Sequence, residues 1–349
     1  FLSEIQTSQV QPIEPVFVDY KKDMSQFEAQ PGIDVLYKKN ETNDIFTLIY
    51  VFNTGTENDP ALNLAFNYLS YLGTDKMTAE EIASEMYDIA CSFYMNAGAN
   101  QSSIQITGLS ENMGKAMEIV EGLIAGAKPD EAILENLKGD MLKSRADAKL
   151  NQSRCFGALQ RYLFYGGDFI RRTTLTDPAL QALTSEQLLA KIGGLMGKQH
   201  EVLYYGPQKE TEIKSALAEH HKVAADLQPL EKKFSALLPT DANKVVLAQY
   251  DAKQLYYLQF SNRGEKFDVA ADPEITLYNE YFGGGMNTIV FQEMREARGL
   301  AYSAWATLAT PSNANGDYSY YAFIATQNDK MQKAVEAFDD IINNMPESE

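Results

Sequence analysis

The sequence predicts an α+β protein built from two homologous domains, each an antiparallel-rich sheet with helices packed mainly on one face. At 349 residues the chain exceeds the usual size of one domain, so two are expected. The order strand, strand, helix, helix, strand, strand, helix occurs in both halves. Phe52–Thr74 also aligns with Ser261–Gly285 at an offset of about 209 positions. Each piece has a strand end, Asn-x-Gly, an acidic loop, a helix and a glycine stop, which indicates a duplicated domain.

The first domain is predicted over residues 1–225. Residues 1–30, with Pro12 and Pro15, are expected to form an extended arm lying on the domain. Strands are predicted where β-branched and aromatic residues gather, and helices where apolar residues recur at helical spacing. The predicted strands are 33–38, 45–53, 92–97, 103–108 and 202–205, and the predicted helices are 61–72, 78–88, 110–127, 129–150, 154–165 and 185–193. Thr78 and Glu81 have the spacing of a capping box.

The second domain is predicted over residues 243–349, after a proline-containing linker at 226–242. Its predicted strands are 245–250, 255–261, 302–307 and 318–326, and its predicted helices are 272–282, 286–297 and 329–344. The glycine triplet Gly283–Gly285 lacks the Gly-Lys-Ser/Thr of a phosphate loop and follows a helix, so it predicts a tight helix–helix corner. The missing initiator Met and the abrupt end favour a fragment or processed chain, with this domain truncated at its C-terminus.

Composition excludes some classes of function. The formal charge of −18 argues against nucleic-acid binding and favours simple solubility. No stretch of about 18 apolar residues is present, so no membrane span is expected. The first residues have no signal-peptide pattern, and the compartment stays open between bacterial periplasm and cytoplasm. Cys91 and Cys155 are expected to be buried free thiols.

The histidines do not predict a metal site. Zinc sites commonly use two histidines on one helix face, at positions i and i+4. The chain has His200, His220 and His221, and the adjacent pair on a polar helix diverges by about 100°. All three are expected to be solvent-facing or structural. A G-x-S-x-G nucleophile motif is also absent from the sequence.

The segment Phe291–Tyr302 has the pattern of a helix that runs into Gly299 and leads to a strand. It places Arg295 seven residues before Tyr302. A guanidinium and a phenol held together can bind a peptide carbonyl or an oxyanion. The structural alternative is an arginine that complements a helix C-terminus and a tyrosine in the core.

Tyr281–Ala306 closely resembles the signature of the second domain of pitrilysin-type zinc metallopeptidases, the inverzincins, whose relatives include insulin-degrading enzyme and the mitochondrial processing peptidase. In that family a glycine-rich corner leads to a helix carrying R-E-x-x-G-L-x-Y. The match here is Arg295 and Glu296, followed by Arg298–Tyr302. The resemblance implies a metallopeptidase-like duplicated fold over most of residues 32–345.

The family's zinc motif, H-x-x-E-H, is missing. It lies on the first helix of the first domain, shortly before a Gly-Thr pair that this chain retains at Gly73 and Thr74. Counted back from there, Leu64, Asn67 and Tyr68 occupy the motif positions, and no histidine precedes His200. The resemblance therefore implies no zinc or other cofactor in this chain and zinc in a partner half.

By this resemblance the chain is a non-catalytic half of a zinc metalloendopeptidase, inactive alone. It would bind and orient a peptide substrate with a zinc-bearing homologous half, in cis or in trans. Arg295 and Tyr302 would hydrogen-bond the substrate carbonyl or oxyanion in the partner's zinc site. The alternatives are a purely structural scaffold subunit and, least favoured, an autonomous zinc peptidase.

Overall fold

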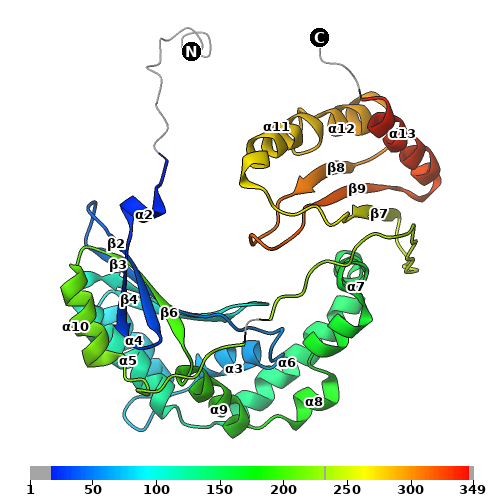
Figure 1. Ribbon diagram of the computed structural model, residues 1–349. Coiled ribbons are helices and arrows are strands. Elements are labelled where there is room, and N and C mark those ends of the chain that lie inside the picture. The colour runs from blue at the N-terminus through cyan, green and yellow to red at the C-terminus, as the bar shows by residue number, and fades with distance from the viewer. Residues whose placement is uncertain (1–16, 232, 346–349) are drawn as a thin grey trace, which may run out of the picture. The chain divides into compact units, whose positions relative to one another are not determined.

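The computed structural model describes residues 17–231 and 233–345, and Figure 1 shows the course of the chain. Contacts divide it into two compact units. The first holds the described residues up to Asn136 with Pro178–Lys233, and the second holds Leu137–Asp177 with those from Phe234 on. The predicted domain boundaries remain a prediction, and the units differ from them in grouping residues 137–177 with the second part of the chain. Pro12 and Pro15 lie outside the described residues.

A six-stranded sheet forms the centre of the first unit. Its strands are β1 (Ser25–Gln30), β2 (Ile33–Lys39), β3 (Ile45–Phe52), β4 (Cys91–Ala97), β5 (Ser102–Leu109) and β6 (His200–Gly206). Their order is β1-β2-β6-β3-β5-β4, and only the β2–β6 pair is parallel among these neighbours. Residues 25–30 of the predicted extended arm form β1, an outer strand that pairs with β2.

Helices of the first unit cover one face of this sheet (Figure 1). Burial alternates along β2 and β3, which is typical of a sheet with one covered face. The helices that lie wholly or partly in this unit, including short turns, are α2 (Tyr20–Asp23), α3 (Leu62–Leu69), α4 (Ala79–Asp88), η1 (Ser110–Asn112), α5 (Met113–Gly126), α6 (Glu131–Lys149), α8 (Asp177–Ala182), α9 (Ser185–Met196) and α10 (Glu210–His220). Of these, α6 belongs to the second unit from Leu137 on. The Thr78/Glu81 capping box is confirmed at the start of α4.

The second unit has a three-stranded antiparallel sheet. Its order is β7 (Gln254–Ser261), β9 (Ser319–Gln327), β8 (Ser303–Ala309). The predicted strand at 245–250 is wrong: these residues form no strand, and β7 pairs with β9. Val245 and Leu247 are more than four-fifths exposed, so their apolar pattern does not reflect a buried strand.

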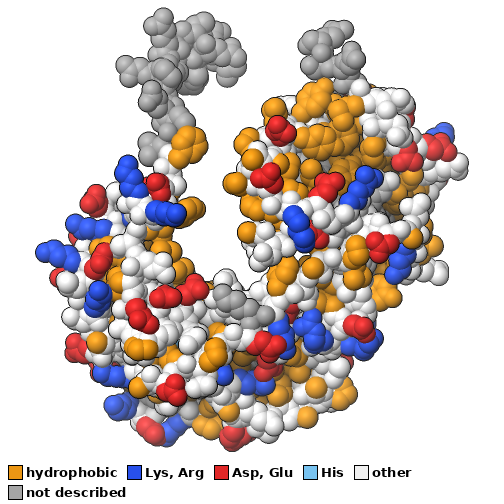
Figure 2. Space-filling model, viewed as in Figure 1, with side chains coloured by type: hydrophobic (Ala, Val, Ile, Leu, Met, Phe, Trp, Pro, Cys, Tyr) orange, Lys and Arg blue, Asp and Glu red, His pale blue; other side chains and the backbone are white. Residues whose placement is uncertain are grey.

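Helices cover both faces of the second sheet. The helical segments are α7 (Gln152–Thr173), η2 (Val269–Ala271), α11 (Asp272–Phe282), α12 (Ile289–Phe291), η3 (Gln292–Ala297), η4 (Asn328–Lys330) and α13 (Met331–Asn343). One face carries an apolar core that includes Phe282, Met294 and Phe338. On the other face, Phe156 and Phe164 of α7 contact strand aromatics. Figure 2 also shows hydrophobic side chains gathered at the surface over α11 and α12.

The glycine triplet forms the predicted corner between α11 and α12. Gly283 is required there, because a Cβ on it would lie 2.3 Å from the backbone oxygen of Ala306 in β8. This close approach lets the corner pack directly on the sheet.

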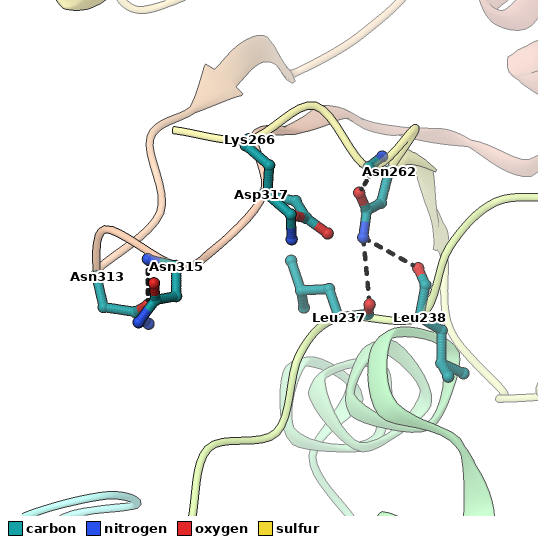
Figure 3. Close-up of polar contacts among 8 residues, drawn as sticks. Leu237, Leu238, Asn262, Lys266, Asn313, Asn315 and Asp317 are labelled. Carbon is teal, nitrogen blue, oxygen red and sulfur yellow. Dashed lines mark hydrogen bonds and ion pairs between the residues drawn. The ribbon is translucent and has the colours of Figure 1, made fainter. Parts of the chain in front are cut away.

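The end of the predicted linker is fixed to the second unit. Asn262 is buried, and its side-chain nitrogen donates to the carbonyls of Leu237 and Leu238 at 3.2 and 3.4 Å (Figure 3). The Leu238 amide donates to the Phe164 carbonyl, which lies beside a break in α7 at Gly166. Residues 237–240 therefore belong structurally to the second unit.

The predicted fold class is confirmed, and the two units share a sequence of elements. In each, a strand, two helices, two strands, a 3-10 turn and a helix follow in this order, and the second unit adds the 3-10 turn η2 before α11 and the π-helix η3 after α12. β3 and β7 begin and end 209 positions apart. The same offset relates Ala90 and Gly299, which both have positive φ, at 51° and 57°. These correspondences support the duplication, which stays a hypothesis.

Candidate functional site

The Arg295 segment forms a widened helix. Only Ile289–Phe291 is α-helical, and Gln292–Ala297 is a π-helix, which corrects the α-helix predicted over 286–297. The Arg298 amide donates to the Glu293 carbonyl, five residues back. Gly299 then turns the chain with a φ of 57°, and β8 follows. π-helical turns are rare and frequently occur at functional sites.

Arg295 and Tyr302 are brought together. The Arg295 guanidinium carbon lies 5.6 Å from the centre of the Tyr302 ring and 4.9 Å from that of Phe291. Both distances are typical of cation–π contacts. Tyr302 is 72% exposed, and the Arg295 side chain is 43% exposed. The two polar groups are therefore adjacent and accessible to a molecule that approaches this surface.

The surrounding contacts fix this turn to the body of the unit. The Tyr302 amide donates to the Ala325 carbonyl at 3.0 Å, which ties the turn to β9. Met294 is fully buried. Arg298 donates to Asp340 on α13 at 3.0 Å and pairs with Glu293 at 3.3 Å. Hydrogen bonds from Asn344 and Arg298 lower the pKa of the Asp340 carboxyl. Arg298 thus supports the turn, whereas Arg295 is presented at its surface.

Arg295 has an acidic neighbour, Glu296, and its contact with this residue is weak. Its Nε lies 3.5 Å from an Oε1 of Glu296, a contact between two half-exposed groups. Exposed pairs of this kind are weak, on the order of 0–1 kcal/mol. A substrate carbonyl or oxyanion can therefore replace the glutamate at little cost, and the Tyr302 phenol adds a second donor.

The positions of the family's zinc motif hold structural residues. Leu64 and Tyr68 of α3 are fully buried, and Asn67 is exposed. The Tyr68 hydroxyl accepts from the Asp130 amide at 2.7 Å and donates to the Ser185 Oγ at 2.7 Å. Tyr68 therefore joins the starts of α6 and α9 to α3. A hydrocarbon, an amide and a phenol do not fit zinc, which takes imidazole, thiolate or carboxylate ligands.

Among residues 17–231 and 233–345, no group of three or more His, Cys, Asp or Glu side chains is placed to hold a metal ion. Within the same described part of the chain, no helix is long and apolar enough to cross a membrane.

Sequence reasoning missed a histidine pair. His200 and His221 are buried, and their Nε2 atoms are 2.8 Å apart. The histidines were predicted to be either solvent-facing or structural, and the burial of His200 and His221 fits a structural role. Their pairing had no local signal, because they are 21 residues apart, and the end of α10 must fold back to the start of β6 to bring them together. Cys91 is buried as expected, whereas Cys155 is only partly buried.

Part of the chain matches a metallopeptidase family model. Residues 199–348 match the family model described as the Peptidase M16 inactive domain. The recognition as a pitrilysin-type (M16) peptidase homologue of the non-catalytic kind is thus confirmed by the match over residues 199–348 and by similar proteins and structures.

Individual proteins and structures similar to this chain include zinc protease homologues and an M16 inactive domain. An uncharacterized zinc protease of Streptomyces coelicolor is 23% identical over 266 residues, which are 71% of this chain and 56% of that protein. The chain thus spans little more than half of this relative. The M16 inactive domain from Pseudomonas fluorescens has a TM-score of 0.71 at 17% identity, covering 93% of this chain and 81% of that one. The periplasmic protease PqqL from Escherichia coli has a TM-score of 0.73 at 14% identity, covering 97% and 39%. These structural matches establish the fold.

Proposed function

We propose that this chain is the metal-free half of a zinc-dependent metalloendopeptidase, and that it binds and orients peptide for a zinc-bearing homologous half. The observation that carries the proposal is the adjacency of Arg295 and Tyr302 on an exposed, well-anchored turn. Neither group can hydrolyse a peptide unaided. Both are hydrogen-bond donors, and charge-assisted donors stabilise developing negative charge on a substrate oxygen.

The partner half would supply zinc, which polarises a substrate carbonyl and activates water. This chain's part is to place two donors where that carbonyl becomes negative. Arg295 brings a fixed positive charge, and the Tyr302 hydroxyl brings a neutral donor. Stacking of the guanidinium between Phe291 and Tyr302 restricts its orientation before substrate arrives. Such preorganisation is the source of catalytic gain at oxyanion sites.

The adjoining strand suits an extended peptide. β8 is one of the two outer strands of its sheet and begins one residue after Tyr302. Its Ala306 amide already donates to the Gly283 carbonyl, and its Leu308 backbone bonds the Asn279 side chain, so an extended peptide would add along the start of the strand, next to Tyr302. Exposed apolar side chains lie on α11 and in the corner that follows it, among them Leu277 and Met286, both more than 70% exposed. Unfolded peptides, with their own apolar residues exposed, are the substrate class that this surface fits.

The test is reconstitution with the H-x-x-E-H-bearing half from the same organism, using a fluorogenic unfolded peptide. The proposal predicts that each part alone is inactive and that the two together cleave the peptide. The scaffold alternative predicts that the zinc-bearing half gains nothing from this chain. Cleavage by this chain alone, with stoichiometric zinc, would instead identify an autonomous peptidase.

A further inference from the structure

A buried polar network lies in the first unit, apart from the Arg295/Tyr302 turn. It consists of His200 at the start of β6, His221 directly after α10, and Glu121 on α5, and is called the histidine network below. Each histidine is 4% exposed, and the Glu121 side chain is 12% exposed. The network joins the end of α10 to the preceding strand β6 and to α5, whose Glu121 is 100 residues from His221.

Three contacts define the network. His200 Nδ1 lies 2.7 Å from the carbonyl oxygen of Lys198. His200 Nε2 lies 2.8 Å from His221 Nε2. His221 Nδ1 lies 2.5 Å from Glu121 Oε1. Because each contact is a short hydrogen bond, each must hold one proton.

The number of protons follows from the chemistry of the partners. A carbonyl oxygen can only accept, so His200 Nδ1 carries a hydrogen. Two ring nitrogens at bonding distance share one proton, since two N–H groups would point at each other. The contact between His221 and Glu121 also holds one proton, whether as imidazolium and carboxylate or as two neutral groups. The network therefore holds three protons and has no net charge.

A fourth proton has no favourable place. On the Nε2 pair it would set two N–H groups against each other and break the contact. On Glu121 or His221 it would leave a net positive charge in the interior, which is costly. The hydrogen bonds of the network are thus complete when it holds three protons, and a fourth proton weakens them.

The surroundings do not offset such a charge. From β3, the Tyr50 ring lies 4.1 Å from the His221 ring, and the Phe52 ring lies 4.7 Å from the His200 ring, measured between centroids. Burial and the Glu121 carboxylate raise the pKa of Tyr50, so this phenol stays neutral. Lys198 contributes its carbonyl oxygen. His220 points instead toward Gly114 of α5 and lies 3.9 Å from Glu219. Tyr50 and Glu121 are the titratable side chains that the described contacts place against the pair.

We propose that the histidine network is a pH-sensitive joint, which holds the end of α10 on the sheet at neutral pH and releases it when a fourth proton enters in acid. Burial lowers the pKa of His200 to about 4, which places this event in the acidic range. The His221 amide bonds to the Leu217 carbonyl and the Val223 amide to the His221 carbonyl, so the helix end and the following turn are the backbone that is released. This joint is independent of the peptidase proposal.

The first test is ring-nitrogen NMR of the whole chain, whose three histidines give a simple spectrum. At pH 7, His200 is expected to carry hydrogen on Nδ1 and none on Nε2, and to gain its second proton only near pH 4. Hydrogen on Nε2 of His200 at pH 7, or a second proton gained above pH 6, would overturn the proposal. This measurement needs no variant.

The second test is hydrogen exchange at residues 217–223, corrected for the intrinsic pH dependence of exchange. In the wild-type chain, protection is expected to fall at least tenfold between pH 7 and pH 4.5. His200→Gln is expected to lower protection already at pH 7 and to remove most of the further fall. His220→Gln is the matched control, and it should behave like the wild-type chain. Equal wild-type protection at both pH values would refute the joint.

Discussion

Replacing Tyr68 by phenylalanine tests whether this residue has a structural role at a position predicted to correspond to the family's zinc motif. The change removes one oxygen from a fully buried side chain and leaves the ring in place. Two partners lose their hydrogen bond: the Asp130 amide and the Ser185 hydroxyl, both at 2.7 Å. Ser185 is itself fully buried, so water cannot readily replace the lost contact.

The expected cost follows from these contacts. A buried polar group left without a partner costs about 1–3 kcal/mol, and a normal bond contributes about 0.5–1.5 kcal/mol. The Tyr68→Phe variant should therefore lose about 2–3 kcal/mol of unfolding free energy. In urea, with a slope of about 1–3 kcal/mol per molar, the midpoint moves down by roughly 1 M.

The assay is urea unfolding followed by far-UV circular dichroism, with Tyr71→Phe as the matched control. Tyr71 is 53% exposed, and removal of an exposed hydroxyl usually changes stability by less than about 0.5 kcal/mol. Equal midpoints for the two variants would show that the Tyr68 hydroxyl contributes nothing, and the structural role would be refuted.

Three further predictions concern stability. Gly283→Ala should lower the free energy of unfolding by about 1–3 kcal/mol, because the added Cβ would meet the Ala306 backbone. Gly285→Ala is the control, because nothing lies within 4 Å of its added Cβ. Equal melting temperatures for the two variants would contradict this prediction. Ala90→Gly should stabilise by about 0.5–1 kcal/mol in urea unfolding, because relief of its positive φ exceeds the entropic cost of glycine; a loss would contradict that reasoning. The lowered pKa of His200, about 4 against 6.5 unfolded, means that the unfolded chain takes up the proton first. Stability from this group is therefore complete above pH 6.5 and falls by up to roughly 3 kcal/mol as pH drops to 4, and unfolding curves of His200→Gln should lack this part of the slope.

Local patterns predicted the elements well, and tertiary contacts decided the rest. The capping box at Thr78 and the corner at Gly283 follow from short-range chemistry, so the sequence alone predicted them. The strand predicted at 245–250 failed because alternating apolar residues do not reveal whether a partner strand is present. The π-helix at Arg295 replaces an α-helix of similar composition, so no residue pattern separates the two.

The candidate site was predictable only in part. The spacing of Arg295 and Tyr302 predicted that the two groups lie near one another, and the turn at Gly299 brings them together. The stacking on Phe291 and the exposure of both groups depend on the packing of Met294 and the sheet. The histidine network was out of reach, because its members come from β6, α5 and the end of α10.

The most direct test of the central claim is the effect of Arg295→Ala on peptide cleavage by the reconstituted pair of halves. Loss of one preorganised donor typically costs about 10²–10³ in kcat, roughly 3–4 kcal/mol. Arg263→Ala is the matched control, since it removes an equal charge from an exposed arginine of the same unit that lies outside the turn. The account predicts a fall in kcat of at least tenfold for Arg295→Ala and a near-normal value for Arg263→Ala. Equal kcat for Arg295→Ala and the wild-type chain would contradict it.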